Sequence, residues 1–211
     1  MNNESKIIRP FGPSFVKTKI PDDIFNSLNT YIDKIIENKK KAKELDFGSN
    51  LAGEVTQEFT LEQDFMESIG WKKFLHTNVE KWIDILIKKK ITSFNIENSW
   101  VVRQFENEYN PTHWHKGHIS GVGYLKVPSN LGEPRQQTKI KSPNGALQLV
   151  HGAKMFLSES TYNIEPKIGD MYLFPNYLMH LVFPFSNSEE ERRSISFNAK
   201  INDEIYDAYG N

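Results

Sequence analysis

Residues 99–126 read SWVVRQFENEYNPTHWHKGHISGVGYLK, and this stretch decides the fold. Its two ends, Ser99 to Glu106 and Ile119 to Lys126, are short apolar runs with a period of two, which is typical of β-strands. Five more such runs follow: Ala146 to Val150, Lys154 to Leu157, Asp170 to Phe174, Leu181 to Phe185 and Arg192 to Ile201. Seven short strands within about a hundred residues predict a sandwich or barrel.

The first half of the chain has helical spacing instead. After a short strand expected at Ser14 to Ile20, Pro21-Asp22 opens a segment whose apolar residues recur with helical periodicity as far as Ile36. The basic cluster Lys39 to Lys41 comes next, and we interpret it as the C-terminal end of this helix, where positive charge complements the helix dipole. The cluster therefore indicates a solvated helix end rather than a contact with nucleic acid.

A second helix is predicted from Phe65 to Leu86, because its apolar residues form one broad face of the kind that packs against a sheet. Before it, Phe47 to Glu58 should form a loop that leads into a short strand. We expect one domain over residues 1–211, mainly β with flanking helices (α+β). Residues 1–95 would be the helical support, and residues 96–202 the β core.

Composition sets limits on function. The net charge of -1 gives no electrostatic reason to bind nucleic acid or an anionic membrane, and the absence of cysteine excludes disulfides and thiolate metal sites. The N-terminal segment lacks the apolar core of a secretory signal, and no apolar run approaches the roughly 20 residues of a membrane span. We therefore expect a soluble, cytoplasmic protein; its oligomeric state is not indicated.

A polar stretch at residues 127–145 is too long for a tight hairpin. We interpret it as a mobile loop near the mouth of the barrel that could act as a lid, with an inert insertion as the alternative.

Histidines cluster in the second half, where His113, His115 and His118 fall within six residues. In a strand or extended loop, His-X-His places both rings on one face, about 6–7 Å apart at Cα, which one ion can bridge. A barrel can bring His180 back beside the first pair. His118 could replace either neighbour as a ligand, and an incidental cluster is the alternative. His76 and His151 stand alone and are interpreted as structural or surface residues.

A polar strand face is the third informative feature. In Arg192-Arg193-Ser194-Ile195-Ser196-Phe197-Asn198, the side chains of Arg192 and Ser194 fall on one face by strand alternation. An arginine presented from a strand interior can hold a carboxylate bidentately, with a serine hydroxyl as a further donor. A solvent-facing edge strand is the alternative, and a register slip of one residue would exchange Arg192 for Arg193.

Read in order, four motifs resemble one family. They are His113-Trp-His115, then Ile119-Ser-Gly-Val-Gly-Tyr124-Leu, then Gly169-Asp-Met-Tyr-Leu-Phe174-Pro175 with His180, and finally Arg192-x-Ser194-Ile-Ser-Phe-Asn198. This set resembles the 2-oxoglutarate- and Fe(II)-dependent oxygenases, and within them a subgroup of marine microbes and their phages with H-x-H, SGVYYL and RISISFN motifs. It spans about Trp100 to Ile201; the helical half matches only loosely.

The resemblance implies a double-stranded β-helix (jelly-roll) and an Fe(II) cofactor held by His113, His115 and His180, the catalytic centre. It implies that Arg192 pairs with the distal carboxylate of the cosubstrate 2-oxoglutarate, that Ser194 assists, and that Tyr124 lines the cosubstrate pocket. The implied reaction uses O2, releases succinate and CO2, and hydroxylates a small molecule or peptide whose identity the sequence does not give. If the gene is phage-encoded, the host cytoplasm is the expected location.

The second ligand position departs from the family pattern. Most members carry Asp or Glu there, whereas this chain has His115, and three neutral imidazoles leave the iron more positive. Glu106, Glu108 or a water could supply an oxygen ligand instead. Two rival functions stay open: a cupin-like metal enzyme that uses no 2-oxoglutarate, and a non-catalytic β-sandwich binding module.

Overall fold

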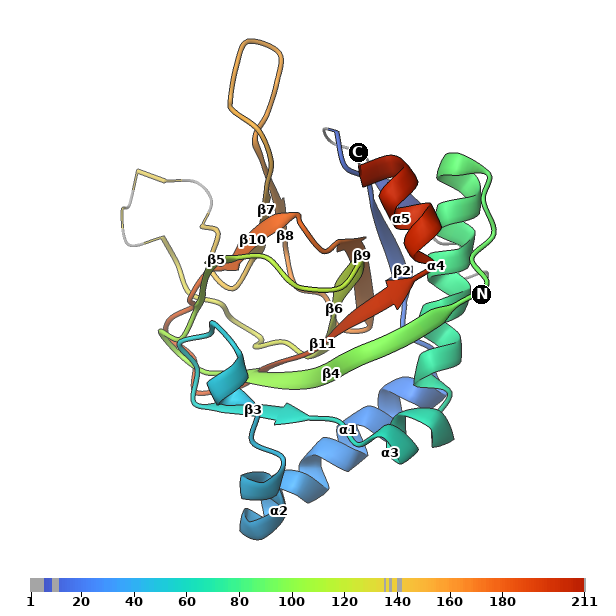
Figure 1. Ribbon diagram of the computed structural model, residues 1–211. Helices are drawn as coiled ribbons and strands as arrows, with labels where there is room; N and C mark the ends of the chain where they lie inside the picture. The colour runs from blue at the N-terminus through green and yellow to red at the C-terminus, as the bar shows by residue number, and fades with distance from the viewer. Residues whose placement is uncertain (1–5, 9–11, 135, 137, 140–141, 211) are drawn as a thin grey trace.

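The computed structural model of the protein describes residues 6–8, 12–134, 136, 138–139 and 142–210. Two antiparallel sheets face each other (Figure 1). The larger sheet has the strand order β1 (Lys6–Ile8), β2 (Phe15–Lys19), β9 (Asp170–Pro175), β6 (Ile119–Lys126), β11 (Arg192–Ile201), β4 (Phe94–Gln104) and β3 (Gln57–Thr60). The smaller sheet has the order β5 (Asn110–His113), β10 (Met179–Val182), β7 (Leu147–Val150) and β8 (Thr161–Ile164). This is the mainly β, jelly-roll architecture that the sequence predicts.

Helices cover the outer face of the larger sheet (Figure 1). α1 (Asp22–Glu37), α3 (Gln63–Ser68) and α4 (Trp71–Ile87) lie on this face. The short helix α2 (Lys39–Glu44) follows α1, a 3-10 turn, η1 (Gly48–Asn50), precedes β3, and α5 (Asp203–Gly210) follows β11. Leu28 of α1 and Leu75 of α4 are fully buried and belong to one apolar cluster with Phe197 of β11. Burying this outer face leaves the inner face, between the two sheets, available for a site.

Glycines on β6 allow this packing to be close. A Cβ at Gly121 would lie 2.5 Å from the carbonyl oxygen of Tyr172 and 2.6 Å from Cε1 of Phe197, so no side chain fits there. On the opposite face of β6, Val122 and Tyr124 join the second apolar cluster, which lies between the sheets. The Gly-Val-Gly-Tyr pattern of β6 therefore follows from one crowded face and one face that lines the interior.

The basic cluster was misinterpreted from sequence. Lys39 to Lys41 do not end α1 but begin the short helix α2, after Asn38 leaves the helical conformation at φ -110° and ψ 93°. The side chain of Asn38 caps α2 by accepting a hydrogen bond from the backbone N–H of Lys41 at 3.1 Å. Lys41 also forms an ion pair with Glu62, with 2.6 Å between Nζ and Oε1, while Lys39 and Lys40 are exposed, as the sequence predicted.

Two further predictions were wrong in detail. The second helix is interrupted: α3 ends at Ser68, and Gly70 adopts a left-handed φ of 74° before α4 begins. Lys154 to Leu157 do not form a strand but the tip of the β7–β8 hairpin, where Phe156 is 92% exposed and finds no sheet to pack on. The strand that follows β7 and pairs with it is instead β8, which the sequence analysis did not identify.

Strand boundaries matter most at the site. The run predicted at Leu181 to Phe185 is β10 at Met179–Val182, so His180 lies inside the strand. β5, also not predicted, ends at His113. The N-terminal half supplies β1, β2 and β3 to the larger sheet, so that residues 1–95 contribute strands as well as helices.

Among the described residues, no helix has both the length and the apolar character that crossing a bilayer requires. In the stretch 127–145, positions 135, 137, 140 and 141 lie outside the described residues, and its role as a lid stays a prediction.

Candidate active site

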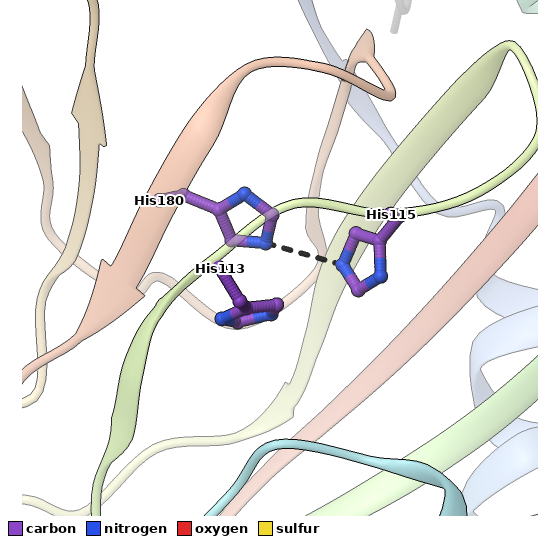
Figure 2. Close-up of side chains that lie close together, drawn as sticks. All are labelled: His113, His115 and His180. Carbon is purple, nitrogen blue, oxygen red and sulfur yellow. Dashed lines mark hydrogen bonds between the residues drawn. The ribbon is translucent and has the colours of Figure 1, made fainter.

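Strand pairing brings three histidines together from distant parts of the chain. His113 on β5 and His180 on β10 are direct cross-strand partners in the smaller sheet. His115 follows two residues later, in the loop after β5, where its backbone N–H donates to the carbonyl of Asn176 at 3.0 Å. Figure 2 shows the three rings turned toward one another. The structure thus gathers the three residues that the sequence singled out.

The geometry of the three rings suits one metal ion. Nε2 of His115 lies 3.2 Å from Nε2 of His180, and one nitrogen from each ring falls within 4.8 Å of the others. Nδ1 of His113 lies 2.7 Å from the carbonyl of Pro111, and Nδ1 of His180 lies 2.8 Å from that of Leu178. In each case the carbonyl favours the tautomer with a proton on Nδ1, which leaves the Nε2 lone pair available as a ligand.

Burial keeps these rings neutral. Desolvation lowers the pKa of His113, and it lowers the pKa values of His115 and His180 to about 3. Two aromatic side chains form part of the wall: the ring of Trp100 lies 5.6 Å from that of His115, and the ring of Phe174 lies 5.0 Å from that of His180. Neutral imidazoles are the form in which histidine binds a metal, so the site needs no deprotonation step at neutral pH.

The other ligand candidates lie elsewhere. The carboxylate of Glu108 accepts hydrogen bonds from the backbone N–H groups of Thr56 and Phe105, and Glu106 accepts one from Asn187. His118 stacks on Tyr206 with ring centroids 4.0 Å apart, and its Nδ1 accepts from the backbone N–H of Ile201. Among the described residues, His113, His115 and His180 are the one group of His, Asp or Glu side chains placed to hold a metal ion.

An arginine lies in the same cavity as the histidines. Arg192 on β11 is 1% exposed and lines the cavity together with Ser194 and the three rings. Its Nη1 donates to Oε1 of Gln104 at 3.0 Å, whereas Nε and Nη2 have no hydrogen-bond partner among the described residues. The guanidinium carbon lies 5.0 Å from the ring centroid of Tyr124, whose buried hydroxyl also lacks a partner within the described chain. A buried cation with two unused donors fits a carboxylate ligand.

Arg193 serves a different purpose. It points to the opposite face of β11, where its guanidinium donates to Oδ1 of Asn29 at 3.0 Å and pairs with Asp33 at 2.7 Å and Glu191 at 2.5 Å. The strand register therefore places Arg192, not Arg193, on the cavity side.

Sequence reasoning missed Gln104. It ends β4 directly opposite Arg192, and it is 1% exposed. A polar residue in the last position of an apolar strand gives no sign of function by itself, and only the strand pairing with β11 could have pointed to it.

The fold and the site together define a class: a jelly-roll protein whose interior joins three neutral histidines to a buried arginine with unused donors. Comparisons with known proteins give this class a family. Residues 98–198 match the sequence model of the family described as "Putative 2OG-Fe(II) oxygenase". A search of curated proteins gave no significant match.

Solved structures share the fold at low sequence identity. A prolyl-4-hydroxylase of Pseudomonas putida has a TM-score of 0.55 and 13% identity, over 89% of this chain and 91% of that chain. The viral collagen prolyl hydroxylase of Paramecium Bursaria Chlorella virus-1, as a 2OG complex, gives 0.51 and 15%, over 88% and 94%. HygX of Streptomyces hygroscopicus, with nickel, 2-oxoglutarate and hygromycin B bound, gives 0.54 and 11%, over 88% and 82%.

Residues 98–198 of the β core therefore carry the sequence pattern of the 2OG-Fe(II) oxygenases, and this match together with the shared fold indicates a 2-oxoglutarate- and Fe(II)-dependent oxygenase. The match favours this function over the cupin-like and non-catalytic alternatives that the sequence left open.

Proposed function

We propose that His113, His115 and His180 hold the Fe(II) of this oxygenase, and that Arg192 binds the distal carboxylate of 2-oxoglutarate. One cavity, lined by all four residues, supports the proposal. The three rings present neutral nitrogens to this cavity, and the arginine presents two donors that have no partner among the described residues. A 2-oxo dicarboxylate has matching chemistry, with a chelating 2-oxo acid at one end and a carboxylate at the other.

Ser194 and Tyr124 complete the proposed carboxylate pocket. Both lie on the inner face beside Arg192: Ser194 pairs with Tyr124 across β11 and β6, and both side chains are buried. A hydroxyl that is already dehydrated loses little more when it donates to a carboxylate, and a low-dielectric pocket strengthens that bond. Burial and the nearby guanidinium have opposite effects on the pKa of Tyr124, and burial dominates, so the hydroxyl stays protonated and can donate.

The absence of a carboxylate ligand has an electrostatic consequence. Three neutral imidazoles leave the full charge of a divalent ion in place, and Arg192 adds a further positive charge. A dianionic cosubstrate cancels two of these three positive charges, so its binding should be favoured in this buried cavity. Fe(II) with 2-oxoglutarate supplies the oxidising chemistry, and the residues of this chain orient the cosubstrate and exclude water.

We further propose that the reaction hydroxylates a small molecule or a peptide, with O2 consumed and succinate and CO2 released. The structures of similar fold include prolyl hydroxylases and a protein with hygromycin B bound, which supports both substrate classes. Trp114, between two of the proposed ligands, is 64% exposed and offers an apolar contact for either.

The test is turnover of the cosubstrate. Purified protein with Fe(II), ascorbate and 2-oxoglutarate should form succinate slowly without substrate, and His180→Ala should abolish this. Screening peptides and small molecules for faster succinate formation would then identify the substrate. Succinate formation by wild type no faster than by His180→Ala would contradict the proposed assignment.

A further inference from the structure

Gln104 uses its whole side-chain amide inside the protein. Its Oε1 accepts from Nη1 of Arg192 at 3.0 Å, and its Nε2 donates to two backbone carbonyls, of Glu108 and, at 3.2 Å, of Phe183. The side chain is also directly opposite Arg192 in the pairing of β4 with β11. With both donor hydrogens and the oxygen engaged, the amide has one orientation, and this orientation fixes the guanidinium.

The contact decides which edge of Arg192 is available. Gln104 occupies Nη1, and the nitrogens without a partner among the described residues are Nε and Nη2. These two nitrogens share one edge of the planar guanidinium, and each directs an N–H in the same direction. That edge matches the two oxygens of a carboxylate. Gln104 therefore leaves this pair of N–H groups, the fork formed by Nε and Nη2, free to bind a carboxylate.

The backbone carbonyls of Glu108 and Phe183 connect the Gln104 amide to β5 and β10, the strands that carry His113 and His180. Glu108 lies just before β5, which ends at His113, and Phe183 lies just after β10, which contains His180. One side chain therefore contacts the arginine and the flanks of the two strands that present two of the three histidines. These three hydrogen bonds connect the guanidinium to the flanks of the strands that carry His113 and His180.

We propose that Gln104 is a positioning residue that fixes the distance from Arg192 to the three histidines and so selects the length of the 2-oxo dicarboxylate. This inference rests on the proposed function. A dicarboxylate that chelates at one end can reach a rigid fork only at the matching chain length. If the fork were free to move, shorter and longer acids would bind comparably.

The alternative is a merely structural role, in which Gln104 only satisfies a buried arginine. Loss of Gln104 would then weaken all ligands or destabilise the fold without changing the preference among chain lengths. The ratio of affinities across a homologous series separates the two roles, because a general loss of stability cancels in that ratio.

The experiment measures binding of oxaloacetate, 2-oxoglutarate and 2-oxoadipate, with four, five and six carbons, by calorimetry. Ni(II) replaces Fe(II) so that no turnover occurs. Wild type should prefer 2-oxoglutarate. Gln104→Leu should weaken 2-oxoglutarate about 10- to 100-fold, the order expected for one or two hydrogen bonds to a charged group, and should largely abolish the length preference. Binding of Ni(II) and of pyruvate, which has no distal carboxylate, should not change.

Gln148→Leu is the matched control, because Gln148 on β7 bonds to Asn163 outside the cavity. Gln104→Asn keeps the amide but shortens it by one methylene, and it should also lose the length preference, which covers the case in which Gln104→Leu fails to fold. An unchanged preference in these variants would overturn the inference even if affinity fell. Failure of wild type to bind 2-oxoglutarate would instead contradict the proposed function.

Discussion

His180 on β10 faces His113 on β5 as its direct cross-strand partner, with ring centroids 4.3 Å apart. Antiparallel pairing fixes this approach, and the loop after β5 then adds His115. Removing His180 should therefore leave two ligands that cannot hold the ion tightly. We expect His180→Ala to lose bound Fe(II) or Ni(II), measured by mass spectrometry of metals in the purified protein, whereas the wild type should bind one ion per chain.

The control for this experiment is His151→Ala. His151 is exposed and lies outside the cavity, so its removal should leave the metal content unchanged. Equal metal content in His180→Ala and His151→Ala would exclude the three-histidine site.

The adjacent arginines allow a second matched comparison. Arg192→Leu should weaken 2-oxoglutarate binding at least about 100-fold, because a charge-assisted bidentate contact in a buried site is lost. Arg193→Leu should leave that affinity nearly unchanged but lower the free energy of unfolding, because Asp33 and Glu191 each lose one of their cationic partners. Calorimetry and urea denaturation measure the two effects. If Arg193→Leu weakened 2-oxoglutarate binding and Arg192→Leu did not, the strand register would be wrong.

Glu58 on β3 makes stability depend on pH. It is 3% exposed, its oxygens have no hydrogen-bond partner among the described residues, and burial together with nearby Asp46 and Glu108 raises its pKa to about 8. In the unfolded chain this carboxyl has the ordinary glutamate pKa of 4.5, so the free energy of unfolding should fall as the pH rises from about 4.5 to 8. Glu58→Gln cannot ionise and should gain about 2–4 kcal/mol over wild type at pH 8.5, with a smaller gain at pH 5.5.

Urea denaturation at these two pH values measures the difference. Glu80→Gln is the control, because Glu80 is exposed on α4 and its substitution should have the same small effect at both. A gain for Glu58→Gln that does not depend on pH would mean that Glu58 is ionised in the folded protein.

Substitution of Gly121 tests how closely β6 packs against β9. Because a Cβ there would lie 2.5 Å from a backbone oxygen of β9, Gly121→Ala should force β6 and β9 apart and cost about 2 kcal/mol or more of unfolding free energy. Gly48→Ala, where the new Cβ would find ordinary contacts at 3.4 Å and beyond, should cost much less. Similar values for both variants in urea denaturation would show that β6 can relax.

The strands that could be predicted are those with strong local patterns. β6 and β11 have the predicted bounds because their alternation is uninterrupted, whereas β5 contains Pro111 and only four residues and depends on its pairing with β10. The apolar residues at Met155 to Leu157 predicted a strand because hydrophobicity alone does not reveal whether a neighbouring strand exists. Pairing partners are a tertiary property, and short-range patterns do not specify them.

The residues of the site likewise fall into those that a local sequence pattern reveals and those that it does not. The histidine cluster and the alternation of Arg192 with Ser194 are visible locally, and strand geometry then determines where they point. Gln104 and Glu58 carry no local signal, because each owes its burial and its neighbours to the register of β4 against β11 and β3. Their roles could be inferred only when the hydrogen bonds of Gln104 and the partnerless oxygens of Glu58 were known.

The central claim is tested most directly by a crystal structure of the protein. The crystals would be grown without oxygen and soaked with Fe(II) and 2-oxoglutarate. We expect one ion bound by Nε2 of His113, His115 and His180, and the distal carboxylate of 2-oxoglutarate on the Nε and Nη2 edge of Arg192. An ion on a different set of side chains, or 2-oxoglutarate with its distal carboxylate away from Arg192, would contradict the account.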